Sequence, residues 1–350
     1  MTLKNIENYS QLHPLKEMWI GGAYPEKFYD HLSSKHQDIF SLISEKTNKD
    51  FDKLEKKLND LGVTTHRPSF STVDDYLSED GNNLLKPPVT PCDFALTIND
   101  HLYVIPQYPS GVEPYENALK QYNPKDYTIL DRSKPDPLCY LIFSSFVKIG
   151  KDIYIDYNNL DNDYQKYNKI VVNELAKKHR VHISYTGEHN DSVFCPIKNG
   201  YLVTTPYRNN YAFSFPGWEI CHIKNTSNYE TQRFNTEHKW HIPGIDYMFY
   251  NKEILDIAER WLGEPQETIF DSNMVVVDEK NVLVICENET VFKFFEEIGV
   301  TPHVINFETK HFWDAGLHCF TRDIIRSGTN EDYWPGRGDS GIYIIDEWNE

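Results

Sequence analysis

The chain has 350 residues and a formal net charge of -18, and 39% of its residues are hydrophobic. That charge argues against a nucleic-acid partner or an anionic membrane surface, because both attract clustered Lys and Arg. The sequence has no apolar run long enough to cross a bilayer, and its N-terminus lacks the basic and apolar regions of a signal peptide. The six cysteines show no CxxC pair and no zinc-finger spacing. We therefore expect a cytoplasmic protein with reduced thiols.

The chain opens with polar residues, and we expect residues 1–12 to be flexible. Leu15–Ile20 is a short apolar strand that ends at a pair of glycines. Residues 27–62 form a segment that is predicted to be helical, and Gly62 is suited to end it. The apolar positions of its second half share one helical face: Phe51, Leu54, Leu58 and Leu61. Val63–Arg67 then reads as a strand.

This order of helix and then strand recurs at 170–185 and at 291–307, and 254–263 resembles a degenerate copy. Short strands with turn signals come before these units: 99–105, 150–155, 199–204 and 279–285. A hairpin–helix–strand module repeated along the whole chain predicts a cyclic array. An ordinary α/β sheet with coincidental spacing is the alternative. No linker divides the chain, so we predict one domain over residues 1–350.

Cys319 is the first candidate for chemistry. His318 precedes it, and Arg322 and Arg326 follow within two helical turns. Imidazole and cationic groups lower the pKa of a nearby thiol, because they stabilise the thiolate. A lone cysteine is otherwise often a small buried hydrophobic residue. A nucleophile also needs a base and a substrate pocket, which other segments must supply.

His189 and Asp191 lie in a loop after a strand, where functional groups are often presented. His189 can act as a general acid or base, and Asp191 shares its side in an extended segment. A solvated loop histidine is the alternative. No further ligands stand at a recognisable spacing, so we expect no metal. Asp93 lies at a hairpin entry, and Arg208 ends a strand where it could grip a carboxylate.

Together these stretches resemble the arginine:glycine amidinotransferase family of the guanidino-modifying (pentein) superfamily. Pro91-Cys-Asp93 is similar to the Pro-Arg-Asp turn of the family. The stretch from Glu188 to Phe194 resembles its Met-His-Ile-Asp-Ala-Thr-Phe motif. The stretch from Gly316 to Arg326 resembles its Gly-Phe-His-Cys-Trp-Thr-Cys-Asp-Val-Arg-Arg element. The resemblance implies a five-bladed α/β propeller with its active site at the centre.

The resemblance also implies a role for each candidate residue. Cys319 would attack the guanidino carbon of L-arginine, and His189 would protonate the departing ornithine. Asp93 and Asp191 would hold the guanidinium, and Arg208 the α-carboxylate. A small amine such as glycine would then take the amidino group from Cys319. The substrates would be small molecules, and no cofactor is expected.

One departure from the family pattern concerns the histidine. The family has an Asp that orients the catalytic His, and Ile142 stands there in this chain. A second acidic position falls on Ser145, which we keep with His318 as a further candidate site residue. An amidinotransferase is the leading interpretation. The alternatives are a hydrolase that releases citrulline or urea-type products, and a catalytically impaired arginine-binding protein. The sequence leaves the acceptor amine open, and a homodimer is one option for assembly.

Overall fold

The computed structural model describes most of the chain, and every structural statement below refers to these residues. They are 2–30, 32–77, 84–106, 113–131, 136–141, 143–156, 162–184, 189–205, 214–224, 261 and 270–344.

Five small sheets make up the described part of the fold, and all five share one topology. In each, a central strand pairs antiparallel with one neighbour and parallel with the other. The first three sheets are β3–β4–β5 (Ala95–Ile98, His101–Val104, Tyr127–Ile129), β6–β7–β8 (Phe146–Ile149, Asp152–Asp156, Arg180–Ser184) and β9–β10–β11 (Phe194–Lys198, Tyr201–Thr204, Glu219–His222). The others are β12–β13–β14 (Val275–Val276, Asn281–Val284, Thr301–Val304) and β15–β1–β2 (Thr321–Arg326, Leu15–Ile20, Thr64–His66). The repeated unit agrees with a five-bladed propeller.

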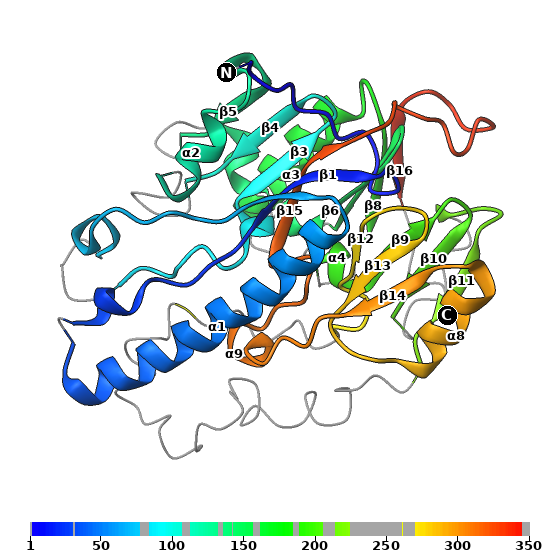
Figure 1. Cartoon of the computed structure of the whole chain (residues 1–350). Helices are drawn as coiled ribbons and strands as arrows, with labels where there is room; N and C mark the ends of the chain where they lie inside the picture. The colour runs from blue at the N-terminus through cyan, green and yellow to red at the C-terminus, as the bar shows by residue number, and fades with distance from the viewer. Residues whose placement is uncertain are drawn as a thin grey trace.

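The last of these sheets joins the two ends of the chain. Strand β15, the second-last of the described strands, pairs antiparallel with β1, and Figure 1 shows the orange strand beside the blue one. An additional strand, β16 (Gly341–Ile344), extends another sheet by pairing parallel with β8. The array of sheets is therefore closed by segments from opposite ends of the sequence.

Helices connect the central strand of a sheet to its parallel neighbour. They are α1 (Ser34–Asp60), α2 (Glu116–Leu119), α3 (Asn162–Leu175) and α8 (Glu289–Ile298). The segment predicted at 27–62 contains a 3₁₀ turn, Glu26–Tyr29, and α1, and the segment predicted at 291–298 is α8. The segment predicted at 170–179 overlaps α3 only in part, because α3 begins eight residues earlier and ends at Leu175. The single turn α2 was not predicted, because four residues carry no helical period. The degenerate copy at 254–263 lies outside the described residues except for Trp261.

Helix α8 shows why the local sequence folds as it does. The side chain of Asn288 accepts a hydrogen bond from the backbone N–H of Val291 at 3.2 Å and so caps the first turn. Gly299 ends the helix with a φ of +70°, a conformation that glycine adopts without strain. Val291 and Phe295 are buried in the core on the inner face. The hydrophobic face of the helix thus covers its own hairpin.

The expectation that residues 1–12 are flexible is wrong for most of that segment. Ile6 and Ser10 are fully buried, and Leu12 is 7% exposed. Isolated β-bridges join Lys4, Glu7, Asn8 and Ser10 to segments of three different sheets. The polar composition suggested a flexible segment. Its backbone N–H and C=O groups instead form hydrogen bonds with the sheets on either side.

Helix α1 packs against the segment that carries Cys319. The Phe51 ring meets the Phe320 ring edge-on, with ring centroids 5.5 Å apart. Asp50 Oδ2 accepts hydrogen bonds from the backbone N–H and the hydroxyl of Thr309, at 2.9 and 3.0 Å. Trp313 Nε1 donates to the Thr47 hydroxyl at 2.9 Å. The long helix is visible along the outside of the molecule in Figure 1. Its contacts hold in place the segment that leads to Cys319.

Two further expectations concern the whole chain. None of the six cysteines, all of which lie in the described ranges, is part of a disulfide. Among the helices that the structure describes, none is both long and apolar enough to cross a membrane.

Candidate active site

Cys319 lies in the short connection between α9 (Lys310–Trp313) and β15, and its side chain is buried. The backbone N–H groups of His318 and Cys319 both donate to Asn273 Oδ1, at 2.7 and 3.1 Å. The carbonyl of Gly316 accepts from the Phe320 N–H at 3.1 Å, which closes the turn. The thiol is thus carried by a turn whose backbone is hydrogen-bonded to the Asn273 side chain.

The side-chain amide of Asn273 is the link between the segments of the site. Asn273 is fully buried, and its Nδ2 lies 3.1 Å from Cys319 Sγ. The same nitrogen donates to the Asp191 carbonyl at 3.3 Å and to the Ser192 hydroxyl at 3.1 Å. A Cβ added to Gly316 would lie 2.5 Å from the Asn273 side chain, so glycine is required for this approach. A donor facing the sulfur favours the thiolate over the thiol.

The Asp191 carboxylate is the buried anionic group of the site. Its Oδ2 accepts a hydrogen bond from His318 Nδ1 at 2.9 Å and lies 3.5 Å from Cys319 Sγ. Its Oδ1 has no hydrogen-bond partner among the described residues. Burial opposes ionisation, but the hydrogen bond from His318 and the charges of His318, His189 and Arg322 lower the pKa of Asp191 below its usual value. The carboxylate is therefore charged, with one oxygen available to a cation.

A second thiol lies against the same carboxylate. Cys92 Sγ is 3.5 Å from Asp191 Oδ2 and 3.6 Å from His318 Nδ1. Arg322 Nη2 donates to both the carbonyl and the sulfur of Cys92, each at 2.9 Å. Burial raises the pKa of Cys92 well above its usual value; Arg322 opposes this rise, and Asp191 and Asp93 add to it. Cys92 is thus a protonated thiol in the absence of a ligand.

The structure brings only some of the predicted residues together. Cys319, Asp191 and His318 are in mutual contact through Asp191. His189 directly precedes the short helix α4 (Asn190–Val193), is half-buried, and is close enough for its charge to act on Asp191. Asp93 ends the 3₁₀ turn Pro91–Asp93 and is half-buried.

Arg208, expected to hold the α-carboxylate, and Ile142, the departure from the family pattern, both lie outside the described residues. Ser145 is buried, and its carbonyl accepts from Asn190 Nδ2 at 2.9 Å. Its hydroxyl has no partner within the described ranges. Asp152, a carboxylate close to these positions in sequence, instead bonds Arg180 at 2.6 Å. It is part of a structural ion-pair network.

Two residues, Asn273 and Cys92, were not assigned a role from the sequence. Arg322 was expected to act as a cation on Cys319, but in the structure it lies on β15 and donates to Cys92. Asn273 lies between strands with no motif of its own that marks a site, so only the three-dimensional contacts identify it. Cys92 and Arg322 stand where the family motifs have Arg and Cys, respectively. Reading the two departures from the family motifs together would have pointed to this pair. The family has Arg and then Cys at these positions, and this chain has Cys and then Arg.

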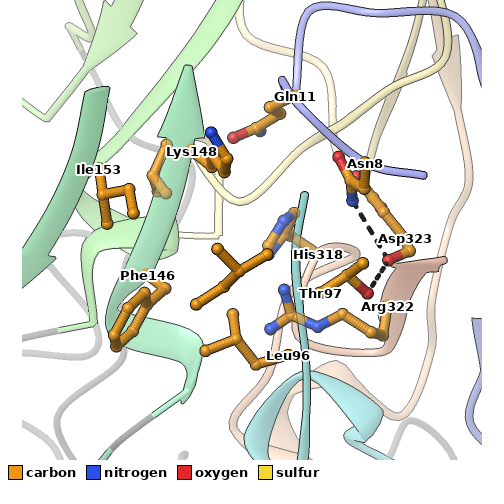
Figure 2. Close-up of a pocket in the computed structure, with 12 residues that line it drawn as sticks. Asn8, Gln11, Leu96, Thr97, Phe146, Lys148, Ile153, His318, Arg322 and Asp323 are labelled. Atoms are coloured by element: carbon orange, nitrogen blue, oxygen red, sulfur yellow. Dashed lines mark hydrogen bonds between the residues drawn. The ribbon is translucent and has the colours of Figure 1, made fainter. Parts of the chain in front are cut away.

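A small cavity of about 30 Å³ is lined by His318, Arg322 and Lys148, among others (Figure 2). Burial lowers the pKa of Lys148 to about 7. Two side chains donate to the backbone oxygen of Asp323 at the cavity edge: Thr97 Oγ1 at 2.9 Å and Asn8 Nδ2 at 3.3 Å. These bonds fix β15 directly after the Cys319 turn.

The sequence is similar to those of known amidinotransferases, although no protein-family model matches the chain. It is 26% identical over 200 residues to the mitochondrial glycine amidinotransferase of Gallus gallus, which covers 55% of this chain and 40% of that protein. It is 23% identical to the L-arginine:L-lysine amidinotransferase of Pseudomonas savastanoi pv. phaseolicola, which covers 54% of this chain and 45% of that protein. The matched stretch thus spans less than half the length of these relatives.

The solved structures that resemble the chain extend over nearly all of it. The inosamine-phosphate amidinotransferase of Streptomyces griseus matches with a TM-score of 0.67 at 16% identity and covers 94% of this chain and 99% of that one. An amidinotransferase of the saxitoxin biosynthetic pathway from Microseira wollei matches with a TM-score of 0.63 at 18% identity, with the same coverage. The dimethylarginine dimethylaminohydrolase of Pseudomonas aeruginosa matches with a TM-score of 0.51 at 12% identity over 90% of this chain and all of that one.

These likenesses establish the fold class of the chain. The chain has the α/β fold that amidinotransferases share with a guanidino-modifying hydrolase, and the predicted fold class is confirmed. The resemblance to the amidinotransferase family, first inferred from motifs, is confirmed by sequence and by fold.

Proposed function

We propose that this protein is an amidinotransferase that moves the amidino group of L-arginine through Cys319 to a small amine. The observation that carries the proposal is the buried Asp191 carboxylate. Its Oδ2 lies 3.5 Å from Cys319 Sγ, and its Oδ1 has no hydrogen-bond partner in the part of the chain that the structure describes. Carboxylates bind the planar guanidinium by paired hydrogen bonds. A guanidinium on Asp191 would present its carbon to the sulfur.

The first half-reaction transfers the amidino group to the enzyme. The Cys319 thiolate attacks the guanidino carbon and forms a C–S bond. The bond between that carbon and the δ-nitrogen of the ornithine part then breaks, and ornithine leaves as an amine after it takes a proton from His189. Such a covalent step splits one difficult reaction into two easier ones. The Asn273 amide, 3.1 Å from the sulfur, supports the thiolate both before attack and when it leaves.

The second half-reaction regenerates the thiolate. An acceptor amine attacks the amidino carbon, the C–S bond breaks, and His189 takes up the proton that the amine loses. The names of the relatives include glycine, lysine and inosamine phosphate, so glycine or a comparable small amine is the proposed acceptor. Asp93 would be the second carboxylate for the guanidinium, and Arg208 would hold the α-carboxylate of L-arginine.

The proposal includes the setting in which the protein acts. Six cysteines outside any disulfide suit a reducing compartment such as the cytoplasm. The substrates are small molecules, and no cofactor takes part in either half-reaction. A homodimer remains the proposed alternative to a monomer, and sedimentation of the purified protein distinguishes them.

The test is to incubate the protein with L-arginine alone and measure its intact mass and the release of ornithine. We expect a gain of one amidino group on the wild type and on Cys195→Ala, which removes a buried thiol outside the site. Cys319→Ala should gain nothing. Asp191→Asn keeps the shape but removes the charge, and should bind L-arginine at least about tenfold more weakly.

Other outcomes lead to different functions. Citrulline formed without an acceptor would make the protein a hydrolase, in which water resolves the Cys319 adduct. Binding of L-arginine with neither adduct nor ornithine would replace the transferase proposal with the binding-protein alternative. Ile142, at the position of the histidine-orienting Asp of the family, would then be the first residue to restore, as Ile142→Asp.

A further inference from the structure

Three potential metal ligands from separate segments converge beside Cys319. Cys92 Sγ lies 3.5 Å from Asp191 Oδ2 and 3.6 Å from His318 Nδ1, and these two are 2.9 Å from each other. Cys92 belongs to the 3₁₀ turn before β3, Asp191 to α4, and His318 to the turn before β15. All three side chains are buried. The three atoms form a compact triangle of a thiol, a carboxylate and an imidazole.

The edges of this triangle fit a tetrahedral zinc ion. Bonds of about 2.3 Å to sulfur and about 2.0–2.1 Å to nitrogen and oxygen place sulfur about 3.5–3.6 Å from either partner, and nitrogen about 3.3 Å from oxygen. Both observed edges from Cys92 Sγ agree with this geometry. The edge between His318 and Asp191 is shorter, at 2.9 Å, because a hydrogen bond joins them. An ion that replaces the shared proton would need to widen that one edge by about 0.4 Å.

The surroundings also suit a zinc–thiolate bond. Two anionic ligands, Cys92 as thiolate and Asp191 as carboxylate, would neutralise the charge of a divalent cation. Arg322 Nη2 already donates to Cys92 Sγ at 2.9 Å, as outer hydrogen bonds commonly do to metal ligands. A thiolate and an imidazole favour zinc over magnesium or calcium, which prefer oxygen ligands. Binding would release the Cys92 proton.

We propose that Cys92, Asp191 and His318 form a zinc-binding site, and that zinc and the guanidinium substrate exclude each other. Exclusion follows because zinc on Oδ2 would neutralise the same carboxylate that the guanidinium needs on Oδ1, and two cations would then share one buried anion. Cys319 Sγ lies 3.5 Å from the same Asp191 oxygen, so a bound ion would lie near the nucleophile, and water would fill its remaining coordination position. The zinc-bound protein would be unable to take up substrate. Zinc therefore acts here as a reversible inhibitor, and not as a cofactor.

The direct test uses cobalt(II) as a spectroscopic substitute for zinc on the full chain after treatment with chelator. We expect one equivalent of cobalt to give a thiolate-to-metal charge-transfer band, and zinc to abolish it by displacement. Cys92→Ser should lose the band and bind zinc at least about tenfold more weakly. Cys319→Ser and the control Cys195→Ser should keep the band, because the thiolate ligand is Cys92.

The result would overturn the proposal if wild type gave no band, or if Cys319→Ser lost the band while Cys92→Ser kept it. Thermal unfolding of each variant shows whether it is folded, and Cys92→Ala serves if Cys92→Ser is not. His318→Ala is the independent second variant, and unchanged zinc affinity in it would also contradict the site.

Mutual exclusion is tested by titrating zinc in the presence and absence of L-arginine. We expect L-arginine to raise the apparent dissociation constant for zinc by a factor of one plus the ratio of its concentration to its own dissociation constant. Simultaneous binding of both ligands would contradict the exclusion. The cobalt band reports on the ligands without turnover, so failure of the amidinotransferase proposal would leave the outcome of the metal test unaffected.

Discussion

Arg322 and Cys92 are direct partners: the guanidinium donates to the sulfur and to the carbonyl of Cys92, each at 2.9 Å. The family motifs given above have Arg at the first of these positions in the chain and Cys at the second, the reverse of this sequence. In either order the two positions hold one cation and one thiol. In this chain the guanidinium charge that acts on Asp191 comes from Arg322 on β15, and not from the turn that carries Cys92.

We predict that exchanging the two residues is tolerated better than changing either one. Cys92→Arg alone would put two buried guanidinium groups together, and Arg322→Cys alone would leave the carbonyl of Cys92 without its donor. The double variant restores one residue of each kind. Denaturation by urea of the four proteins should give a favourable coupling of about 1–3 kcal/mol in the free energy of unfolding. Additive effects would show that the two positions are independent.

Asn273 is predicted to support the reactivity of Cys319. Asn273→Asp keeps the size of the side chain but replaces the donor at 3.1 Å from the sulfur with a carboxylate oxygen. A negative charge there should raise the pKa of the Cys319 thiol. The rate of Cys319 alkylation by iodoacetamide, followed against pH, should therefore shift to higher pH by at least about one unit. An unchanged profile would mean that the Asn273 amide does not act on the sulfur. Cys319→Ala identifies the background from other thiols.

The close approach of Gly316 to Asn273 predicts a sharp cost for one methyl group. Gly316→Ala would place a Cβ 2.5 Å from the Asn273 side chain, so the Cys319 turn must move. We expect a loss of about 1–3 kcal/mol in stability together with slower Cys319 alkylation. Gly336→Ala is the matched control, since no other described atom lies within 4 Å of a Cβ built there. Equal melting temperatures of the two variants would contradict the close contact.

We predict that Glu17 on β1 accounts for part of the loss of folding stability at acid pH. Burial opposes its ionisation, but hydrogen bonds from His66, Lys4 and Tyr122 lower its pKa to about 2. A carboxyl whose pKa is lower in the folded state stabilises the protein fully above its unfolded pKa of about 4.5, and this stabilisation is lost as the pH falls toward 2. Glu17→Gln should be less stable at neutral pH and depend less on pH in that window.

The free energy of unfolding in urea, measured at several pH values, tests this prediction. The wild-type and Glu17→Gln curves should converge near the acid end. Glu45→Gln is the control, because Glu45 pairs with Lys49 on the exposed surface of α1 and should change little. Parallel curves for wild type and Glu17→Gln would show that Glu17 does not contribute to acid unfolding.

Much of the fold was predictable because its strands are marked locally. The strand predicted at Leu15–Ile20 has those bounds in the structure, and turn residues mark the hairpins that contain β4, β7, β10 and β13. The N-terminal segment was misjudged because its burial depends on grooves between distant sheets, which no local pattern reveals. The pairing of β16 with β8 is likewise a contact across more than 150 residues.

The site was predictable where a motif carries the residues. Cys319 and Asp191 were singled out from the sequence, and the structure brings them together. The metal interpretation of Asp191 was set aside because no further ligands stand at a regular spacing. Cys92 and His318 nevertheless lie beside it, since the sheets bring the turns before their strands to one place. Spacing rules detect ligands on one helix or hairpin, and they cannot detect ligands drawn from separate blades.

The pairing of β15 with β1 has a consequence for the protein during its synthesis. The segments that carry Cys92, Asp191 and Asn273 leave the ribosome well before the one that carries Cys319, and that last segment settles only when β15 joins the strand made first. A growing chain can therefore form its early sheets before Cys319 reaches Asp191 and Asn273. If Cys319 is the nucleophile, closure of the ring would complete the site last, and incomplete chains would lack it.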